Sequence, residues 1–392
     1  DYSHNSIALF IALIRNNNIV VPLSSMTEQE KNEFIEIAEI EYIIRFCDDE
    51  QYEIIRLNRS EIKNTMLRAF REEKKGGLIL FSSGSTGKSK AILHDLSKLI
   101  KKFAIKSHKP LRTITFLLFD HIGGIDTLFD ILSNYGTVII LPGRDPLTVC
   151  NTIEKHRAEL LPTSPTFLNL LIFSEEYKNY DLSSLKIITY GAEPMAEITL
   201  KKLNNIFPEL KLIQKYGLSE FGAIRSKSEF NESKWFKIVG DVDIKIVNNQ
   251  LLIKSDTSML GYLNAPDPFD GEGYFHTGDI IEVDGEYIKI VGRDSEIINV
   301  GGQKVFPVEV ENVIMEMPEV EDVIVYGEKN PITGNIVVAK VKPEIDISFN
   351  EMKKKIRTFC KNKISGYKIP VKVIVVKELQ YSLRCKKMRG NF

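Results

Sequence analysis

Short β-rich runs alternate with amphipathic stretches over the first half of the chain, and this alternation constrains the fold more than any other feature. From Ile7 to about Gly217, the runs are rich in isoleucine, leucine and phenylalanine, and the stretches between them are amphipathic. This pattern is typical of an α/β fold, in which strands and helices are wound around mostly parallel sheets. The predicted strands are IVVPL (19–23), YIIRF (42–46), LILF (78–81), TITFLLF (113–119), TVIIL (137–141), KIITY (186–190) and KLIQKY (211–216).

Capping residues and strand ends add detail to the α/β prediction. Thr27, followed three residues later by Glu30, predicts a capping box at the start of a helix. In open sheets of this kind, ligands bind beyond the carboxyl ends of the strands. Ser82, Gly191 and Tyr216 lie at the ends of three predicted strands, so we expect them at the binding edge.

After about Glu220 the pattern changes to closely spaced hairpins, which predicts further domains. VDIKIV and QLLIKS are joined by Asn-Asn, and IIEV and EYIKIV by Asp-Gly, pairs that favour two-residue hairpin turns. We therefore predict a small β-barrel or a layered β-subdomain over about residues 225–290, within a large N-terminal domain of residues 1–293. The segment GRDSE (292–296) is the predicted hinge, and residues 294–392 are predicted to form a small, mobile α+β lid domain.

Composition and charge limit the classes of function. The chain has 392 residues, of which 43% are hydrophobic, and a formal net charge of −1. It is therefore long enough for two or more domains, and its overall charge gives no case for binding nucleic acid or a membrane surface. Between Glu351 and Phe392, however, thirteen Lys/Arg residues accompany only two acids. A solvated helix face and a surface for an anionic partner both explain this basic tail.

The cysteines and apolar runs favour a cytoplasmic location. The four cysteines have no CxxC spacing, and the six histidines form no metal signature, so neither a disulfide framework nor a structural zinc site is expected. No apolar run reaches the roughly 18 residues of a membrane span, and no cleavable leader is recognised. Because the chain opens almost directly with an apolar helical pattern, we expect that an N-terminal segment precedes it in the whole protein.

The stretch SSGSTGKSK (82–90) follows an apolar strand and has the composition of a phosphate-binding loop. Glycines let the backbone approach a polyphosphate, hydroxyl and backbone N–H groups donate to its oxygens, and lysines offset its charge. The stretch is not a Walker A loop, because the first glycine of GxxxxGK[ST] would fall on Ser82. Taken alone, the same residues also fit a flexible Ser/Gly turn.

Four further stretches decide between these alternatives. They are YGLSE (216–220), YFHTGDI (274–280), GRDSEIINVGGQKVFPVEVE (292–311) and ELQYSLRCKKMR (378–389). Together with SSGSTGKSK, in this order and at these separations, they resemble the adenylate-forming superfamily of acyl- and aryl-CoA synthetases, peptide-synthetase adenylation domains and beetle luciferases. The resemblance covers nearly the whole chain, and it implies an enzyme that cleaves ATP at the α-phosphorus and yields AMP.

The resemblance implies nucleotide contacts for individual residues. The loop would hold the β- and γ-phosphates, Tyr216 would pack on adenine, Ser219 would touch the α-phosphate and Glu220 would help to hold Mg²⁺. Asp279 would accept both ribose hydroxyls, and Arg293 would face the ribose and the phosphates. The implied nucleotide- and cofactor-binding residues are Ser82, Ser83, Gly84, Ser85, Thr86, Gly87, Lys90, Gly191, Ala192, Glu193, Tyr216, Gly217, Asp279, Arg293, Gly301 and Gly302.

The terminal motif carries the implied catalytic lysine. Aligned with the family, it places Lys386 where a lysine offsets the charge that develops on the carboxylate and α-phosphate oxygens. The preceding residue, normally glycine, is Cys385, and the adjacent Lys387 is the alternative for the same role. Upstream, YGAEP resembles the wall of the adenine pocket, with Glu193 near the base. The implied catalytic residues are Lys386, Glu220, Ser219 and His121.

The segment LLFDHIGGID (117–126) resembles the family's acyl pocket. His121 aligns with a histidine that is common in CoA ligases, although a satisfied core histidine is the alternative explanation. Amino-acid-activating relatives carry an aspartate in this region, but Asp120 is one residue out of place, which favours a simple carboxylic acid. Gly301 and Gly302 resemble the loop that borders the pantetheine tunnel once the lid has moved.

These assignments predict ATP-dependent activation of a carboxylic acid to an acyl-adenylate and then acyl transfer to a thiol. The lid would reorient about residues 292–296 between the two steps. The implied cofactors are ATP, Mg²⁺ and CoA, or the phosphopantetheine of an acyl or peptidyl carrier protein. Two alternatives are adenylation of an amino or acyl acid for loading onto a carrier protein, and a catalytically weak nucleotide-binding scaffold with the same fold. The identity of the acid stays open.

Overall fold

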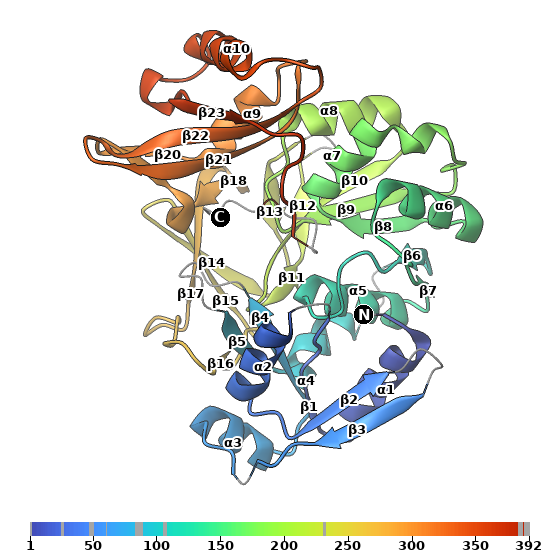
Figure 1. Cartoon of the computed structure of the whole chain (residues 1–392). Helices are drawn as coiled ribbons and strands as arrows, with labels where there is room; N and C mark the ends of the chain where they lie inside the picture. The colour runs from blue at the N-terminus through green and yellow to red at the C-terminus, as the bar shows by residue number, and fades with distance from the viewer. Residues whose placement is uncertain are drawn as a thin grey trace.

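The structure is a computed structural model in which the chain forms the predicted α/β fold. Figure 1 shows a large N-terminal part and a smaller C-terminal domain, drawn in orange and red, beside helices α7 and α8. The structure describes residues 2–24, 27–46, 51–59, 61–82, 89–104, 108–229, 233–382 and 387. None of the helices in these ranges is both long and apolar enough to cross a membrane.

A six-stranded sheet forms the centre of the N-terminal part, in the order β11-β10-β9-β8-β6-β7. Neighbouring strands are parallel from β7 to β10, and β11 is antiparallel to β10. Parallel neighbours need crossover connections, which helices supply here. The elements are β6 (Arg112–Ile114), α5 (Ile122–Ser133), β7 (Thr137–Ile139), α6 (Pro146–His156), β8 (Leu160–Thr163), α7 (Pro165–Ser174), β9 (Ile187–Gly191), α8 (Glu197–Ile206), β10 (Lys211–Leu218) and β11 (Gly222–Ile224).

Local sequence explains where this sheet agrees with prediction and where it differs. Helices α6 and α7 each begin with proline, after Asp145 and Ser164 whose side chains accept a backbone N–H of the first turn. The predicted strand 113–119 is wrong beyond Ile114, where the chain turns toward α5. Strand β8 is not among the predicted strands, and it contains Pro162, a residue type that is uncommon within central strands.

The phosphate-loop stretch connects two antiparallel strands. Strand β4 (Gly77–Ser82) pairs with β5 (Lys90–Asp95), and Ser82 lies opposite Lys90. These strands belong to a four-stranded sheet with β1 (Ile19–Val20) and β16 (Gly261–Tyr262) at its edges. A Walker A loop leads from a strand into a helix, so the strand-to-strand connection confirms that SSGSTGKSK is a different kind of loop.

The first hundred residues pack around this sheet. The capping box at Thr27 and Glu30 is confirmed. The predicted strand at 42–46 is also confirmed, but it pairs antiparallel with a neighbouring strand in a separate two-stranded sheet. The elements are α1 (His4–Arg15), α2 (Glu28–Ile37), β2 (Tyr42–Phe46), β3 (Tyr52–Arg56), α3 (Thr65–Glu72) and α4 (Leu96–Leu99).

The predicted hairpins form a third sheet, in the order β12-β13-β18-β17-β15-β14. The β14–β15 turn is Asn248-Asn249, both with positive φ, as a two-residue turn of this type requires. The β17–β18 turn is Gly285-Glu286, one residue later than the predicted Asp-Gly. The strands are β12 (Ser226–Ser228), β13 (Phe236–Ile238), β14 (Val242–Val247), β15 (Gln250–Ser255), β17 (Phe275–Asp284) and β18 (Tyr287–Arg293).

This sheet corrects the small β-barrel predicted at 225–290 and agrees with the alternative, a layered β-subdomain. Over the described residues the sheet is open, because its order ends at β12 and β14 and these two strands are not paired. Strand β12 follows β11 closely, and the Ser226 hydroxyl donates to the carbonyl oxygen of Gln214 in β10 at 3.0 Å. Strand β12 is thus held against the parallel sheet, and the barrel does not close.

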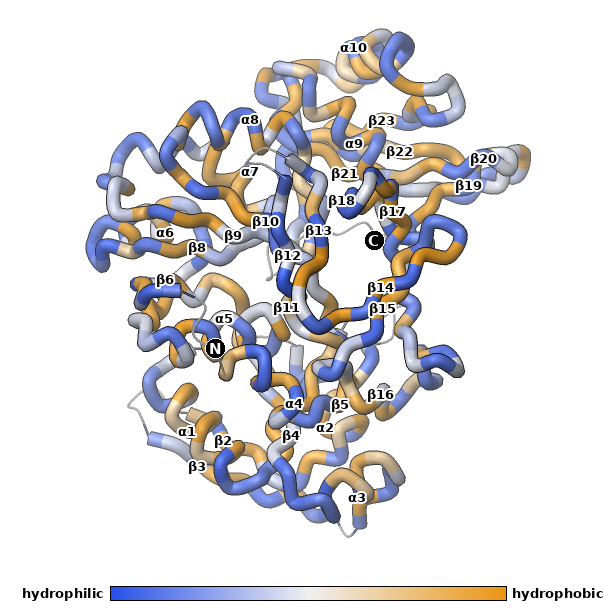
Figure 2. Tube along the Cα trace, turned by 180° about the vertical axis from the view of Figure 1, so that it is seen from behind, coloured by the Kyte–Doolittle hydropathy of each residue, from blue (hydrophilic) through white to orange (hydrophobic). Residues whose placement is uncertain are grey.

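The C-terminal domain is the predicted α+β unit. Helix α10 buries Met352, Ile356 and Cys360 on one side, and Figure 2 shows hydrophobic and hydrophilic residues alternating along it. Phe173 of α7 and Ile198 of α8 pack against this domain's core. Its elements are β19 (Ile298–Val300), β20 (Gln303–Val305), α9 (Pro307–Ile314), β21 (Val320–Asn330), β22 (Gly334–Pro343), α10 (Phe349–Lys361) and β23 (Lys372–Val375).

Ion pairs within this domain use many of the basic residues of the tail. Between Asp294 and Phe392, seventeen Lys/Arg residues accompany thirteen acids. Acids that precede α10 in the chain therefore offset much of the charge of the tail, which favours a solvated, internally paired surface over a single anion-binding face. The pairs are Lys355–Glu319, Lys363–Glu316, Lys368–Glu309, Lys372–Glu328 and Lys387–Asp322.

Helix α5 packs so closely on the preceding turn that it has no room for a side chain at Gly124. A Cβ there would lie 2.0 Å from the carbonyl oxygen of Leu118. We expect Gly124→Ala to lower the free energy of unfolding by about 3 kcal/mol, because backbone must move to relieve the overlap. Urea titration measures the loss. Gly271→Ala is the matched control, since a Cβ there meets nothing within 4 Å, and equal effects of the two changes would contradict the prediction.

Candidate functional site

Three of the predicted nucleotide-binding residues, Tyr216, Asp279 and Arg293, meet at one point. Strands β17 and β18 place Asp279 directly opposite Arg293, and β10 brings Tyr216 from the parallel sheet. Asp279 Oδ1 accepts from Arg293 Nε at 3.0 Å, and Oδ2 accepts from the Tyr216 hydroxyl at 2.7 Å. Burial and the charge of the buried Asp279 raise the pKa of Tyr216, so its hydroxyl stays a donor.

This cluster can accept two further hydroxyl donors. A carboxylate has about four lone-pair directions, so both oxygens of Asp279 can bind a diol while Tyr216 and Arg293 hold it in place. The Tyr216 ring packs on Phe236, with the centroids 5.8 Å apart, and is only 5% exposed. The predicted adenine contact is therefore limited to the small part of this ring that remains accessible.

Tyr262 connects the end of the phosphate-loop stretch to Glu220. The Tyr262 hydroxyl donates to Glu220 Oε1 at 2.7 Å, and Lys90 Nζ lies 4.8 Å from the centroid of the Tyr262 ring. Burial and the charge of Glu220 raise the pKa of Tyr262. The charge of Arg293 acts to lower the pKa of both Tyr262 and Tyr216, against these larger effects. Tyr216 and Tyr262 also pack in the same hydrophobic cluster, so the two groups of residues are neighbours.

The turn between β10 and β11, which carries Ser219, is fixed from two sides. His94 in β5 is fully buried, and its Nε2 lies 2.8 Å from the carbonyl oxygen of Ser219. A carbonyl oxygen only accepts, so Nε2 carries the proton. On the other side, the buried Asp126 of α5 accepts from the backbone N–H of Ala223 and pairs with Lys102 at 2.8 Å. The turn is thus clamped between β5 and α5.

Two of the predicted glycines lie where strands approach too closely for a side chain. A Cβ on Gly191 would be 2.5 Å from the carbonyl oxygen of Lys215, and one on Gly217 would be 2.7 Å from that of Gly222. The next residue after β9, Ala192, has a φ of +69°, a left-handed conformation that is uncommon for a residue with a side chain. Backbone crowding thus accounts for glycine at both positions, and a ligand-binding role for them stays a prediction.

Glu193 contacts the C-terminal tail as well as its own domain. Its Oε2 accepts from the Thr166 hydroxyl at 2.6 Å, and its Oε1 accepts from the backbone N–H of Lys387 at 2.8 Å. The tail therefore reaches the predicted adenine-pocket segment in this structure. Whether Glu193 also contacts adenine stays a prediction.

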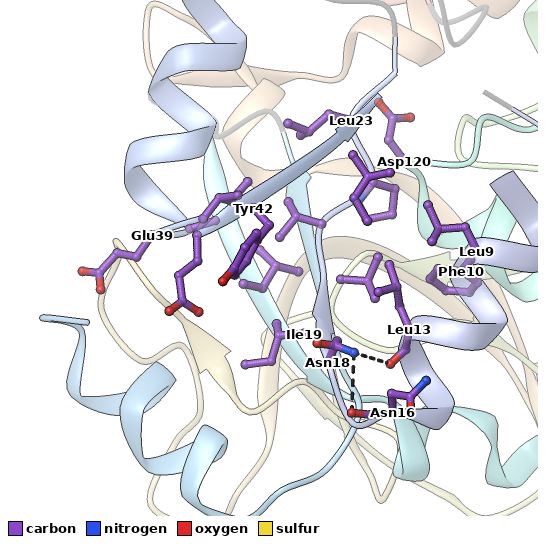
Figure 3. A pocket seen from close by; sticks show the side chains of 18 of the residues that line it. Leu9, Phe10, Leu13, Asn16, Asn18, Ile19, Leu23, Glu39, Tyr42 and Asp120 are labelled. Atoms are coloured by element: carbon purple, nitrogen blue, oxygen red, sulfur yellow. Dashed lines mark hydrogen bonds between the residues drawn. The ribbon is translucent and has the colours of Figure 1, made fainter. Parts of the chain in front are cut away.

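His121 and Asp120 line different cavities. His121 precedes α5 as its N-cap residue, its Nδ1 accepts from the backbone N–H of Gly123 at 3.0 Å, and it lines a small cavity of about 20 Å³ together with Ala192. Asp120 accepts from the Ser24 hydroxyl at 2.5 Å and lines a separate cavity of about 590 Å³. Figure 3 shows this larger cavity between α1, β1 and β2, and none of the predicted site residues that the structure describes lines it.

The remaining predicted positions divide into a hairpin turn and residues outside the described part of the chain. Gly301 and Gly302 form the β19–β20 turn with φ of +58° and +86°, and a Cβ on either would meet nothing within 4 Å. Backbone conformation alone thus accounts for glycine there, and a role beside pantetheine stays a prediction. Outside the described residues lie Ser83, Gly84, Ser85, Thr86, Gly87, Cys385 and Lys386.

Lys387, the alternative catalytic lysine, has its ammonium occupied. Lys387 Nζ lies 2.6 Å from Asp322 Oδ1 and donates to the carbonyl oxygen of Val323 at 2.8 Å. Both side chains of the ion pair are buried. A catalytic lysine must direct its charge at the substrate, so this arrangement favours Lys386 for that role.

The metal-binding capacity of the site rests on Glu220. Among the described residues, no three His, Cys, Asp or Glu side chains gather into a metal-binding group. Mg²⁺ in nucleotide-dependent enzymes needs only one or two carboxylates, because phosphate oxygens and waters supply the other ligands. Glu220, oriented by Tyr262, fits that donor set.

Sequence reasoning missed three residues that position the site, namely His94, Thr166 and Tyr262. Tyr262 lies in GYLN, a short segment without a strong pattern, and contacts Glu220 from 42 positions away. His94 lies inside an apolar strand, where a single polar residue was the only signal. Thr166 follows Pro165, the first residue of α7, and no local pattern distinguishes it from an ordinary residue at a helix start.

The chain matches two family models along its length. Residues 2–263 match the family described as AMP-binding enzyme, and residues 309–382 match the AMP-binding enzyme C-terminal domain. Sequence relatives include 4-coumarate–CoA ligase-like 2 of Arabidopsis thaliana, 29% identical over 74% of this chain and 56% of the relative. Another is indoleacetate–CoA ligase of Aromatoleum aromaticum, 29% identical over 77% of this chain and 64% of the relative. The chain thus spans little more than half of the length of these relatives.

Solved structures share the fold. ATP-bound MatB from Rhodopseudomonas palustris matches with a TM-score of 0.80 and 20% identity, over 97% of this chain and 84% of that protein. The match covers both the N-terminal part and the C-terminal domain of this chain, so the two parts have counterparts together in one solved structure.

The buried His94 makes stability depend on pH. Burial lowers its pKa to about 4 from 6.5, so between these values the unfolded chain binds the extra proton. Stability contributed by neutral His94 is therefore complete above pH 6.5 and is lost as the pH falls toward 4, by about 3 kcal/mol in total. In His94→Gln the amide can still donate to Ser219 but does not titrate. The free energy of unfolding, measured by urea titration, should therefore fall between pH 7.5 and pH 4.5 by about 2 kcal/mol less in this variant than in the unchanged protein.

The exposed His276 supplies the matched control for this experiment. His276→Gln should leave the pH dependence of unfolding close to that of the unchanged protein. The same pH dependence in His94→Gln as in the unchanged protein would show that His94 is not the titrating group.

Proposed function

Since this chain belongs to the AMP-binding enzyme family, we propose that it activates a carboxylic acid with ATP and transfers the acyl group to the thiol of CoA. The joined clusters Tyr216–Asp279–Arg293 and Lys90–Tyr262–Glu220 carry this proposal. The first offers a buried carboxylate to a diol, and the second sets a cation and a carboxylate beside the end of the phosphate loop. That combination suits a nucleotide whose phosphates must be held for displacement at the α-phosphorus.

In the first step a carboxylate oxygen of the substrate attacks the α-phosphorus, the bond between this phosphorus and the bridging oxygen breaks, and pyrophosphate leaves. The phosphate loop from Ser82 to Lys90 holds the leaving group, and Asp279 holds the ribose. Glu220 would hold Mg²⁺, which would supply positive charge against the phosphates. Lys386 stabilises the charge that develops where the carboxylate and the α-phosphate meet.

In the second step the thiol sulfur attacks the carbonyl carbon of the acyl-adenylate, and the bond to AMP breaks. We assign this step to a second orientation of the C-terminal domain, reached by rotation about residues 292–296, with the domains divided as 1–293 and 294–392. The backbone there forms a short 3-10 turn, Asp294–Glu296, between β18 and β19, and a few residues of this kind can absorb a hinge rotation. Gly301 and Gly302 would then border the incoming thiol.

The acid is proposed to be a simple carboxylic acid, and aromatic acids come first for testing. Relatives named as 4-coumarate– and indoleacetate–CoA ligases support that order. Asp120, the residue nearest to an amine-binding position in the sequence, bonds to Ser24 and lines the other cavity, which argues against an amino acid. Carrier-protein phosphopantetheine is the second acceptor to test.

We also propose that the enzyme works in the cytoplasm. The two described cysteines, Cys150 and Cys360, are buried free thiols, and burial raises their pKa values to about 12 and about 11. Thiols of this kind need no oxidising compartment.

The proposed function is tested by acid-dependent exchange of labelled pyrophosphate into ATP. We expect exchange with at least one acid from a panel of aromatic, fatty and amino acids, followed by thioester formation when CoA is added. Nucleotide binding without exchange for any acid would instead support the scaffold alternative. Loading of a carrier protein in preference to CoA would identify the other acceptor.

Lys386 should be needed for the first step alone. Lys386→Ala is expected to lower acid-dependent exchange by about 10²- to 10³-fold, because it removes the charge that stabilises the transition state. Thioester formation from supplied acyl-adenylate should stay within about twofold of normal, since the tail has left the site in that step. Lys377→Ala, an exposed lysine of the same domain, is the control. Equal losses in both half-reactions would contradict the assigned role.

Tyr262 should tune the binding of Mg²⁺ through Glu220. Tyr262→Phe removes the hydroxyl that orients the carboxylate, and we expect the Mg²⁺ concentration for half-maximal exchange to rise about tenfold. Titration of the exchange rate with Mg²⁺ measures the shift. Tyr287→Phe in β18, away from Glu220, should leave it unchanged, and an unshifted titration in Tyr262→Phe would remove Tyr262 from the proposed site.

A further inference from the structure

The C-terminal tail is fastened to its own domain by one buried carboxylate, Asp322. Asp322 Oδ1 lies 2.6 Å from Lys387 Nζ and accepts from the backbone N–H of Val323 at 2.8 Å. Asp322 Oδ2 accepts from the Tyr381 hydroxyl at 2.8 Å. Tyr381 and Lys387 also form an antiparallel bridge. Two points of the tail, six residues apart, therefore meet on one carboxylate.

The burial of this pair sets it apart from the other ion pairs of the domain. The side chains of Lys387 and Asp322 are 11% and 4% exposed, whereas those of Lys372 and Glu328 are 46% and 35% exposed. A buried pair gains little net stability, because both charges lose their hydration. Such a pair does impose a defined geometry, because an unpaired charge would be left buried by any other placement of the tail.

The backbone of Lys387 makes a second contact, across the domain boundary. Its N–H donates to Glu193 Oε1 at 2.8 Å, and Glu193 is itself held by the Thr166 hydroxyl at 2.6 Å. A single residue of the tail thus joins its own domain through its side chain and the N-terminal domain through its backbone. This residue immediately follows Lys386.

We propose that Lys387, anchored by Asp322, is a positioning residue that delivers Lys386 to the substrate and docks the tail on Glu193 during adenylation. This inference rests on the proposed function. It gives the two adjacent lysines different roles, one as the charge that meets the substrate and the other as the anchor. Lys387 acts through Lys386 and does not itself touch the reacting atoms.

The test separates positioning from structural support by comparing single and double variants. Asp322→Asn leaves the Lys387 ammonium buried without its carboxylate, and Lys387→Met leaves the carboxylate without its cation. Both should lower thermal stability and lower kcat for acid-dependent exchange by about 10- to 100-fold, because a misplaced catalytic group costs a factor of this size. The KM for ATP and the rate of thioester formation from supplied acyl-adenylate should change by less than about twofold.

The double variant Asp322→Asn/Lys387→Met is the decisive arm. It removes both charges, so thermal stability should recover relative to the single variants. Adenylation should stay low because the anchor is still absent. Recovery of adenylation together with stability would show that the pair is merely structural and would overturn the proposal, as would parallel losses in both half-reactions. Lys372→Met, which breaks the half-exposed pair with Glu328, is the matched control and should leave both half-reactions unchanged.

Hydrogen exchange distinguishes failure of this proposal from failure of the proposed function. With α,β-methylene-ATP and Mg²⁺ present, the C-terminal peptide that contains Lys387 should be protected in the unchanged protein and lose protection in Asp322→Asn. If no acid supports exchange of pyrophosphate but this difference in protection is found, the proposed function fails and the anchor stands. Equal protection in both proteins would overturn the anchor, whatever the activity.

Discussion

The turn between β10 and β11 is the constraint on which the rest of the site depends. The backbone carbonyl oxygen of Ser219 accepts a hydrogen bond from His94 in β5 of the four-stranded sheet. The backbone carbonyl oxygen of Glu220 accepts from the N–H of Met259 at 2.8 Å. Asp126 of α5 holds the strand that leaves the turn. Because these partners come from separate elements, the turn fixes the four-stranded sheet, the parallel sheet and α5 relative to one another. Glu220 then needs only Tyr262 to set the direction of its carboxylate.

Buried carboxylates serve the same purpose elsewhere in the molecule. Asp126 joins α5 to β11, Asp279 joins the hairpin sheet to β10, and Asp322 joins the C-terminal tail to β21. Each of them has a cationic partner and at least one hydrogen-bond donor from a different element. A buried charge is tolerated only when it is satisfied in this way. Each carboxylate therefore specifies one relative placement of its elements and disfavours the alternatives.

Sequence predicted the parts of this protein that are determined locally. The capping box at Thr27 and the Asn248-Asn249 turn follow from the conformational preferences of a few neighbouring residues, and both are present. The order of the motifs predicted the family, and so Tyr216, Asp279 and Arg293 could be grouped before their geometry was known. The open third sheet depended on where β12 would meet β10, and no local pattern reports such a contact.

The positioning residues were beyond reach of the sequence for the same reason. His94, Thr166 and Tyr262 act on residues that lie 125, 27 and 42 positions away. The register of the terminal motif favoured Lys386 as the catalytic lysine and left the adjacent Lys387 as the alternative. The carboxylate of Asp322, which only the structure reveals as the partner of Lys387, supports the same choice because it occupies the Lys387 ammonium.

A lid that changes its orientation needs strong contacts within itself and weak ones across the boundary. The tail meets this requirement, since its side-chain anchor is a buried ion pair inside the C-terminal domain, whereas its contact with Glu193 is one backbone hydrogen bond. A hydrogen bond to a charged acceptor contributes about 1.5–3 kcal/mol, while removing one partner of a buried ion pair costs about 3–5 kcal/mol. When the domains separate, the bond to Glu193 is therefore the one to break. In the proposed second step the tail would travel with the C-terminal domain as one body, so that a single rotation would both withdraw Lys386 and free the site for the thiol.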